Sequence, residues 1–466
     1  MGFLGSTAEN IATFLVVLTV LVFVHELGHY LVARWNGVRI ETFSIGFGPE
    51  LFGWFDRRGT RWRFSAILVG GYVKMFGDAD AASMPGEELP AMTAEERAVS
   101  FHHKPLPARA AVIAAGPAAN FLFTIVVLTA LFATYGQPYT PPEVGVVPPD
   151  SPAAAAGIQP HDVIVSIDGQ RVNRFEDVQD DLQLNTGTPI PIVVRRNGAD
   201  LTLSATPKLV TRTDRFGNSQ DYATLDIENY TAPEVGQVNP GSAAAAAGIQ
   251  PGDVFASVNG TEVGTFGDLQ HVVRQDTDAS PLTLEIKRGN QVLTVSVAPK
   301  VSEVADEAGV KHSIGLLGVS PRPTYIQRPI TRAVVEAGGE TWSMTTGILR
   351  AVGQMIRGTR NTDEIGGPLR IVQMSGQVVQ GGGLLGLLVF MAGLSVNLGL
   401  INLFPIPVLD GGHLLFYAAE ALRGRPLGQR AQEFGFRVGL AIVLTLMVFA
   451  TWNDLAQFHL WPFTKV

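Results

Sequence analysis

The sequence predicts a multi-span α-helical membrane protein, with about four transmembrane helices, into which two α+β domains are inserted. Three observations predict this class: charged residues are scarce, four apolar segments are long, and one stretch of the chain recurs. Charged residues make up 16% of the 466 residues and hydrophobic residues 46%, whereas soluble domains have roughly 25% charged residues. The mean hydropathy is positive, at +0.21, which favours an integral membrane protein.

Composition also limits the possible partners and cofactors. A net charge of -8 gives no reason to expect binding to nucleic acid. The chain has no cysteine, which excludes disulfides and cysteine-ligated zinc. Any metal ion must therefore be bound by His, Asp or Glu.

Four segments are apolar over the roughly 20 residues that a helix needs to cross a bilayer. They are residues 11–33, 108–135, 384–404 and 434–450. We interpret the first as a retained span and not as a cleaved signal peptide, because no basic residue precedes it and its apolar run continues into a His-Glu pair.

Basic residues gather in two connections, between spans one and two and between spans three and four. They are Arg34, Arg39, Arg57, Arg58, Arg61, Arg63 and Lys74 in the first connection, and Arg423, Arg425, Arg430 and Arg437 in or beside the second. Short basic connections stay in the cytoplasm. We therefore expect both connections to be cytoplasmic, and the long region 136–383 to lie across the membrane.

That long region contains an internal repeat, because residues 151–169 recur as residues 242–260. Each copy predicts a short Ala-rich helix that ends at a glycine, then a strand, a tight Asp-Gly or Asn-Gly turn and a second helix. Two copies predict two small domains, since a solenoid needs at least three repeats. The pattern resembles PDZ domains, which bind extended peptides by adding a strand to a sheet edge.

The resemblance to PDZ domains implies a loop that binds the carboxylate of a peptide. In the second copy this loop comprises Leu316, Leu317, Gly318 and Val319. In the first copy it is residues 224–227, where Asp226 replaces the usual glycine and is expected to repel a terminal carboxylate.

These features divide the chain into five expected parts. Residues 1–137 form the first membrane part, with two spans and a cytoplasmic loop that includes a membrane-associated β-loop. Residues 138–228 and 229–322 are the two PDZ-like domains, residues 323–383 an extracytoplasmic amphipathic linker region, and residues 384–466 the second membrane part with two spans. The amphipathic helix of the linker is expected either to lie on the membrane surface or to pack on the PDZ-like pair.

The stretch His25-Glu26-Leu27-Gly28-His29 lies inside the first span. On a helix, His25 and His29 share one face and can bind one metal ion, while Glu26 can accept a proton from the attacking water. The alternative is that both histidines pack between spans. Ionisable residues in a span are costly without a functional role, which favours the metal site.

A third ligand is expected from Asp410, which follows the third span. Pro405 and Pro407 interrupt the helix before it, and two glycines after it permit a tight turn. The alternative is that Asp410 caps the next helix, for which Asp is a good residue. Capping alone does not explain Asn397 and Asn402 at close spacing before it.

The chain resembles the site-2 protease family of intramembrane zinc metalloproteases, and within it the bacterial RseP type. The HELGH stretch carries the match, together with GGYVKM at residues 70–75, GPAAN at 116–120, the segment from Asn397 to Asp410 and the two PDZ-like domains. The resemblance covers nearly the whole chain.

The resemblance implies that His25, His29 and Asp410 bind Zn²⁺ and that Glu26 is the general base. It implies that Asn397 and Asn402 grip an unwound substrate, and Pro405 and Pro407 are also expected to contact it. We expect Gly70, Gly71 and Tyr72 to offer a strand edge to this substrate. Substrates would be single-span membrane proteins, including an anti-sigma factor and residual signal peptides, with the PDZ-like domains gating or recognising trimmed substrates. The location would be the bacterial inner membrane, with periplasmic PDZ-like domains and an active site toward the cytoplasm.

Two other functions remain open on the sequence alone. A membrane zinc transporter also places His and Asp in spans, but it needs neither a base at Glu26 nor peptide-binding modules. A PDZ scaffold without proteolytic activity would not explain why every residue needed for catalysis is present.

Overall fold

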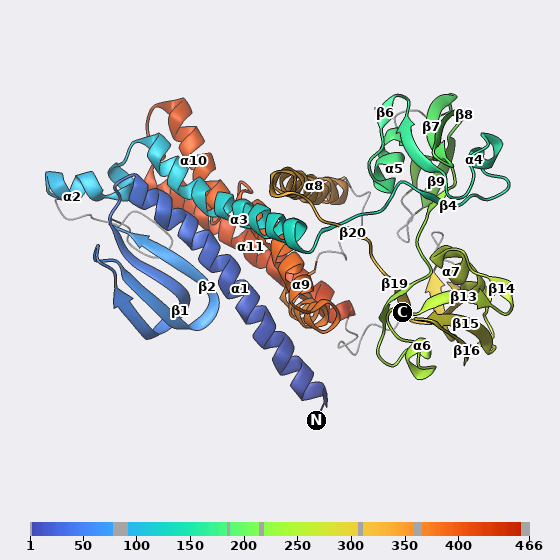
Figure 1. Cartoon of the computed structure of the whole chain (residues 1–466). Helices are drawn as coiled ribbons and strands as arrows, with labels where there is room; N and C mark the ends of the chain where they lie inside the picture. The colour runs from blue at the N-terminus through green and yellow to red at the C-terminus, as the bar shows by residue number, and fades with distance from the viewer. Residues whose placement is uncertain are drawn as a thin grey trace. The chain divides into compact units, whose positions relative to one another are not determined.

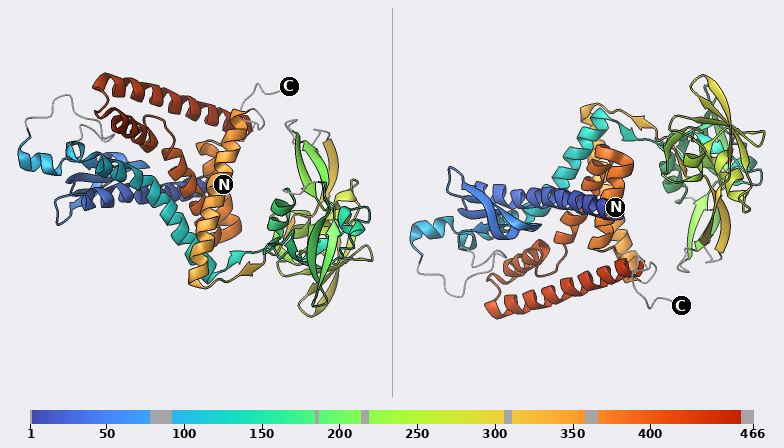
Figure 2. Two further views of the ribbon diagram at one scale, coloured as in Figure 1. Left: turned by 90° about the horizontal axis from the view of Figure 1, so that it is seen from above. Right: turned by 90° about the horizontal axis from the view of Figure 1, so that it is seen from below.

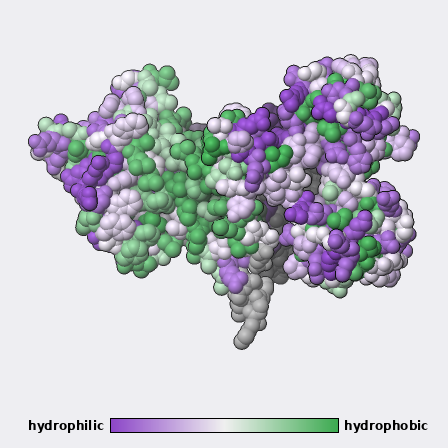
Figure 3. Space-filling model, viewed as in Figure 1, coloured by the Kyte–Doolittle hydropathy of each residue, from purple (hydrophilic) through white to green (hydrophobic). Residues whose placement is uncertain are grey.

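The computed structural model describes residues 2–77, 92–183, 187–213, 219–305, 311–357 and 366–457. The chain divides into two compact units (Figure 1). The membrane unit comprises Met1–Tyr135 and Gln327–Val466, and the β-rich unit comprises Gly136–Ile326. Hydrophobic residues gather on the visible face of the membrane unit, and hydrophilic ones on the β-rich unit (Figure 3).

The membrane unit is mainly helical. Its helices are α1 (Gly2–Trp35), α2 (Ala94–Val99), the 3₁₀ turn η1 (Phe101–His103), α3 (Leu106–Thr134), α8 (Ile330–Ile356), α9 (Pro368–Asn402), α10 (Asp410–Arg423) and α11 (Gln429–Gln457). Four helical stretches are long and apolar enough to cross a membrane: Ala8–Trp35, Leu106–Thr134, Gly381–Asn402 and Arg430–Leu455. The predicted four spans are therefore confirmed as helices. Helix α9 begins well before the predicted span and has a non-helical residue inside it, Gly383.

Helices α1, α3 and α9 pack against one another, as the views from above and below show (Figure 2). Helix α1 lies very close to α3 at Gly28, where an added Cβ would overlap the carbonyl of Ala115. Helices in lipid associate through such small residues, because lipid tails leave little hydrophobic drive for packing. The close crossing brings the histidines of α1 against α3.

Strands β1 (Ile40–Phe55) and β2 (Arg61–Met75) form a bent antiparallel hairpin beside α1. Residue Ile45 pairs with Gly71 on one side and with Phe64 on the other. The two bent strands therefore form four segments side by side, in the order 71–75, 40–45, 61–65 and 50–55. The β-loop expected in this connection therefore comprises both β1 and β2. The two halves of β2 do not pair with each other but lie on either side of residues 40–45.

Helix α8 packs against α3 through a stripe of small residues. Ala333 and Ala337 are fully buried against Leu128 and Phe132 of α3. This helix was expected either to lie on the membrane surface or to pack on the PDZ-like pair, and neither expectation included a contact with α3. The opposite face leaves Val335, Trp342 and Ile356 exposed.

The β-rich unit contains two copies of one arrangement, each with a four-stranded sheet, a short Ala-rich helix and a longer helix. The sheet orders are β6-β5-β7-β8 and β14-β13-β15-β16. The first copy comprises β4 (Val144–Val146), α4 (Pro152–Ala155), β5 (Val163–Ile167), β6 (Gln170–Arg171), α5 (Phe175–Gln183), β7 (Ile190–Arg196), β8 (Ala199–Ala205), β9 (Lys208–Thr213), β10 (Ser219–Thr224) and β11 (Glu228–Asn229). The second comprises β12 (Val235–Val238), α6 (Ala243–Ala246), β13 (Val254–Val258), β14 (Thr261–Glu262), α7 (Phe266–Gln275), β15 (Leu282–Arg288), β16 (Gln291–Val297), β17 (Lys300–Ala305), β18 (Lys311–Leu316) and β19 (Val319–Pro321). Strands β3 (Gln137–Pro138) and β20 (Tyr325–Ile326) pair where the unit begins and ends.

The two copies also repeat a buried ion pair. Arg196 binds Asp162 through two hydrogen bonds of 2.7 Å, and Arg288 binds Asp253 in the same way. Each arginine also donates to the carbonyl of the glycine that ends the short helix. The order of elements is the one that the resemblance to PDZ domains predicts, so the two inserted PDZ-like α+β domains are confirmed.

Candidate metal centre

Three side chains converge on one point in the membrane unit. Helix α1 places His25 and His29 one turn apart on the same face, and their Nε2 atoms lie 3.2 Å from each other. Oδ2 of Asp410 lies 3.1 Å from Nε2 of His25 and 3.5 Å from Nε2 of His29. The two histidines are 8% and 7% exposed, so the cluster is nearly closed to solvent.

The geometry of this cluster fits a tetrahedral metal ion. Zinc–ligand bonds of about 2.1 Å place neighbouring ligand atoms about 3.4 Å apart, close to the separations found here. Oδ2 of Asp410 is buried and receives no hydrogen bond from the residues that the structure describes, as expected of an atom that binds a cation. In the described part of the chain, His25, His29 and Asp410 form the one group of three such residues that could hold a metal ion.

Asp410 reaches the histidines because the chain is irregular between α9 and α10. Helix α9 ends at Asn402, and α10 begins at Asp410 itself. The N-cap of α10 is Leu409, and no side chain makes a capping hydrogen bond there. The alternative role of Asp410 as a helix cap is therefore wrong.

The glycine of the GPAAN stretch makes room for the histidines. A Cβ at Gly116 of α3 would overlap Nε2 of His29 and come within 2.9 Å of Cε1 of His25. The other ring nitrogens also face α3: Nδ1 of His29 lies 2.8 Å from the carbonyl oxygen of Val112, and Nδ1 of His25 lies 3.2 Å from the amide of Asn120. The two Nε2 atoms are thus left to face Asp410.

A cavity of about 260 Å³ adjoins the cluster. It is lined by His25, Glu26, His29, Gly71, Tyr72, Val73, Met75, Ile113, Asn402, Val408, Leu409, Asp410, His413 and Phe436. Of the predicted site residues, the three ligands, Glu26, Gly71, Tyr72 and Asn402 therefore share one cavity. Such a cavity can hold a short stretch of extended peptide next to the metal site.

Four other predicted substrate residues lie elsewhere. Asn397 lines a separate apolar groove of about 150 Å³ between α1 and α9. Pro407 packs beneath Gly435 and Gly439 of α11, and Pro405 is not among the lining residues of the cavity. Gly70 has a φ of 139°, and a Cβ there would overlap the ring of Phe47, so this position of β2 favours a residue without a side chain.

The segment 71–75 is an outer segment of the bent hairpin, and it lies beside Glu26. A Cβ at Gly71 would lie 3.3 Å from Cγ of Glu26 and closer still to the carbonyl of Ser44. Pairing with residues 40–45 satisfies only one edge of this segment. Among the residues that the structure describes, no strand pairs with the other edge of residues 71–74, and such an edge can pair with an extended peptide.

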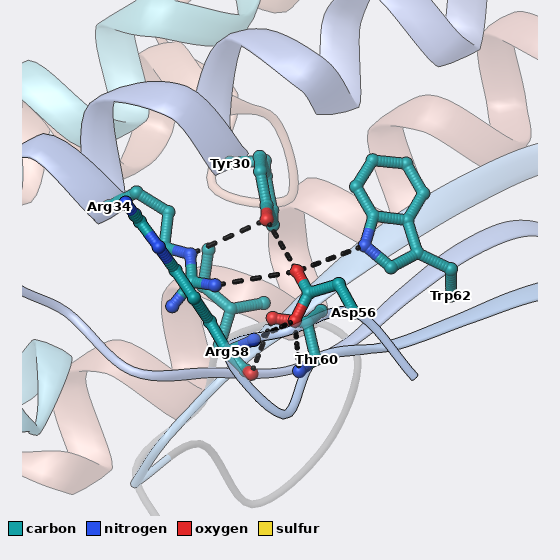
Figure 4. A network of polar contacts seen from close by, with 7 residues as sticks. Tyr30, Arg34, Asp56, Arg58, Thr60 and Trp62 are labelled. Atoms are coloured by element: carbon teal, nitrogen blue, oxygen red, sulfur yellow. Dashed lines mark hydrogen bonds and ion pairs between the residues drawn. The ribbon is translucent and has the colours of Figure 1, made fainter. Parts of the chain in front are cut away.

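Asp56, in the turn between β1 and β2, holds the hairpin to α1 (Figure 4). Its carboxylate receives hydrogen bonds of 2.8 to 3.4 Å from the hydroxyl of Tyr30, the guanidinium of Arg34, the indole of Trp62 and the backbone N–H groups of Arg58 and Thr60. Desolvation acts to raise the pKa of Asp56, but the hydrogen bonds outweigh it and lower this pKa to about 2. Tyr30 directly follows His29, so the sheet is fixed next to the metal centre.

The second PDZ-like domain has a groove of about 230 Å³ between α7 and the predicted carboxylate loop. All four predicted loop residues, Leu316, Leu317, Gly318 and Val319, line it together with Leu269 and Val273 of α7. Gly318 has a φ of 77°, a conformation that favours glycine. In the first domain Asp226 adopts a φ of 60°, and its carboxylate is paired with Lys208.

Asn120 is the site residue to which the sequence analysis gave no role. The GPAAN stretch was recognised as a motif, but its asparagine lies fully buried against His25. The available signal was the spacing: Asn120 follows Gly116 by four residues on an apolar span, which places both on one helix face. His413 also lines the cavity, and its position three residues after Asp410 on α10 gave a comparable signal. Phe436, another lining residue, carried none.

Comparisons with known proteins agree with this geometry. The model of peptidase family M50 matches residues 13–446. A protein named as a zinc metalloprotease from Rhizobium meliloti is 40% identical over 453 residues, which cover 97% of this chain and 98% of that protein. Protease RseP of Yersinia pestis is 37% identical over 466 residues, covering 96% and 98% of the two chains. The solved PDZ domain of HtrA3 with a phage-derived ligand aligns with 20% of this chain and 81% of its own, at 31% identity and a TM-score of 0.14.

Proposed function

Because the chain belongs to peptidase family M50 and is an intramembrane zinc metalloprotease of the site-2 type, we propose that His25, His29 and Asp410 hold the zinc ion and that Glu26 is the general base. The observation that carries this assignment is the convergence of the three ligand atoms within 4.8 Å of one another. The zinc transporter and the inactive PDZ scaffold, which the sequence alone left open, are set aside by the family.

The chemistry that zinc supplies when bound is polarisation of the scissile carbonyl and a lowered pKa of water. Glu26 lines the same cavity, where it can accept a proton from the attacking water and return it to the leaving amine. Asn402 also lines this cavity and can donate its amide N–H to a substrate carbonyl. The low exposure of His25 and His29 keeps the reaction away from lipid and bulk water.

Substrate handling is proposed to use the outer edge of residues 71–74, which pairs with no strand among the described residues. A transmembrane helix hides its peptide bonds in internal hydrogen bonds, so it must unwind before attack. Pairing with the edge at Gly71 and Tyr72 would replace the lost hydrogen bonds and bring the unwound strand beside Glu26. Asn397 lies in a separate groove, and we assign it no contact with this strand.

The proposed location is the bacterial inner membrane, with the metal centre toward the cytoplasm and the PDZ-like domains in the periplasm. The two basic connections support this orientation, since short basic segments are retained in the cytoplasm. An ion pair supports placing both basic connections on the same side of the membrane. Arg109, near the start of α3, lies 2.5 Å from Glu420 of α10. Large exposed apolar side chains of the hairpin, Leu51, Phe52 and Phe55, support membrane association of this loop.

The proposed substrates are single-span membrane proteins, including an anti-sigma factor and residual signal peptides. A relative from Salmonella typhimurium bears the name "Regulator of sigma-E protease RseP", which supports an anti-sigma factor as a substrate. The groove of the second PDZ-like domain supports recognition of a trimmed end, since its loop residues and the apolar side chains of α7 would receive a peptide carboxylate and its last side chain.

The decisive experiment compares the wild type with Glu26→Gln in lipid vesicles that contain a single-span substrate. Wild type is expected to cleave, and to stop when a chelator removes zinc. Glu26→Gln is expected to retain zinc and lose cleavage, whereas His25→Ala is expected to lose both. Equal cleavage by the wild type and Glu26→Gln would refute the assignment of the base.

A further inference from the structure

The side chain of Asn120 is a buried polar group that the proposed reaction does not use. It is 0% exposed on the apolar helix α3. One end of its amide lies 3.2 Å from Nδ1 of His25. The other end, built as Oδ1, has no hydrogen-bond partner among the described residues. A buried amide atom without a partner costs about 1–3 kcal/mol, which leucine at this position would avoid.

The position of the proton on the imidazole of His25 indicates a function for this amide. A metal ion at Nε2 needs the lone pair of that nitrogen, so the ring proton must reside on Nδ1. The Nδ1–H group then needs an acceptor, and Asn120 is the group within hydrogen-bond distance. The oxygen and nitrogen of an amide are distinguished by the hydrogen bonds that they make, and Oδ1 facing His25 supplies the acceptor. Nδ2 in that place would force the proton onto the metal-binding nitrogen.

His29 shows the same arrangement with a different acceptor. Its Nδ1 lies 2.8 Å from the carbonyl oxygen of Val112, which is also on α3. One helix therefore supplies the outer acceptors of both histidines. Oγ of Ser395 on α9 donates to the backbone oxygen of Asn120 at 2.9 Å, and not to the amide side chain that faces His25.

We propose that Asn120 is a positioning residue of the metal centre, whose Oδ1 accepts the Nδ1 proton of His25 and so holds Nε2 ready for zinc. The inference rests on the proposed metal site. Outer partners of metal-binding histidines are typically worth about 10–100-fold in metal affinity. Asn120 acts through His25 and touches neither the substrate nor the metal ion.

The test measures zinc affinity of the full-length protein in detergent by competition with a chelator. Asn120→Leu removes the acceptor and is expected to weaken zinc binding by about 10–100-fold. Asn120→Asp restores an acceptor and is expected to bind zinc at least as tightly as the wild type. Ser395→Ala is the matched control, since it removes the neighbouring hydrogen bond to the backbone and should lower the Tm without changing zinc affinity.

The outcomes separate this inference from the function on which it rests. Wild-type affinity in Asn120→Leu, or an Asn120→Asp variant as weak as Asn120→Leu, would overturn the role of Asn120. Should Asn120→Leu fail to fold, Asn120→Asp decides alone: tight binding supports the acceptor and a loss of ten-fold or more overturns it. A wild type that binds zinc no better than His25→Ala would instead refute the metal site itself.

Discussion

Nε2 of His25 lies 3.1 Å from Oδ2 of Asp410, so the first span and the turn after the third span meet at one point. Neither ligand is fixed by its own helix alone. Helix α3 lies against both histidines through Gly116 and supplies the acceptors for their outer nitrogens. The metal centre is therefore a product of helix packing, and changes on α3 should alter zinc binding even where they touch no ligand.

Replacing Gly116 by alanine is the most direct change of this kind. The added Cβ would overlap the imidazole of His29, and overpacking of a tight core typically costs 1–3 kcal/mol. We expect zinc affinity to fall by about 10-fold or more while the helical content stays the same. Gly347→Ala on α8 is the control, because no atom lies within 4 Å of its Cβ. Unchanged zinc affinity in Gly116→Ala would argue against the close α1–α3 crossing.

The carboxylate of Asp56 is expected to hold the hairpin on α1. Its pKa is lowered to about 2 from an ordinary value of about 3.9, so its stabilising effect is complete above about pH 4 and is lost as the pH falls toward 2. Asp56→Asn should raise hydrogen exchange in the 56–60 turn and reduce cleavage, with zinc content retained. Glu50→Gln, in a more peripheral ion pair with Arg61, should change little. Equal exchange in both variants would contradict the role of Asp56.

The repeated Arg–Asp pairs should stabilise the two PDZ-like domains alike. Asp162 and Asp253 have side chains only 1% exposed, and removing one partner of a buried pair costs about 3–5 kcal/mol. Asp162→Ala and Asp253→Ala should each sharply lower the urea concentration at which proteases cut region 136–326. Asp200→Ala, in the half-exposed pair with Arg195, should cost less than about 1 kcal/mol. Similar effects of all three variants would contradict this account.

Acid should reproduce the effect of those substitutions. Although desolvation acts in the opposite direction, the paired arginine side chains lower the pKa of Asp162 and of Asp253. A lowered pKa in the folded state means that the stabilisation is present above about pH 4 and is lost below it. The urea midpoint of region 136–326 should therefore fall steeply below that pH, and less steeply in the two alanine variants.

The groove of the second PDZ-like domain is expected to bind a peptide with a free C-terminal carboxylate. Gly318→Asp copies the residue of the first domain, adds a negative charge, and places a Cβ against Ser242 in a backbone conformation that disfavours side chains. Binding of an apolar-ended peptide, measured by fluorescence anisotropy on the full-length protein, should be lost in this variant. An amidated peptide should bind poorly to the wild type. Equal binding of both peptides would exclude carboxylate recognition.

Most of the architecture was predictable because each signal was local. The four spans follow from apolar length, and the two inserted domains follow from a repeat with recognisable turns. The residues of the metal centre were expected from one helical spacing and one resemblance. What could not be predicted depends on tertiary packing: nothing in the sequence shows that residues 40–45 pair with both halves of β2, or that Asp56 reaches Tyr30 of α1.

Helix geometry explains why Asn397 and Asn402 line different cavities. Asn397 and Asn402 are five residues apart on α9, which turns the second by about 140° from the first at 3.6 residues per turn. The structure accordingly places Asn402 in the cavity of the metal centre and Asn397 in the groove beside α1. Helical periodicity alone could have predicted this separation.

The central claim is that two histidines and one aspartate hold zinc inside the membrane unit. X-ray absorption at the zinc edge of the purified full-length protein tests it most directly. The account predicts two imidazole nitrogens at about 2.0–2.1 Å with the remaining ligands oxygen, and no zinc bound at this site in His25→Ala. A spectrum without two imidazoles, or one that His25→Ala leaves unchanged, would contradict it.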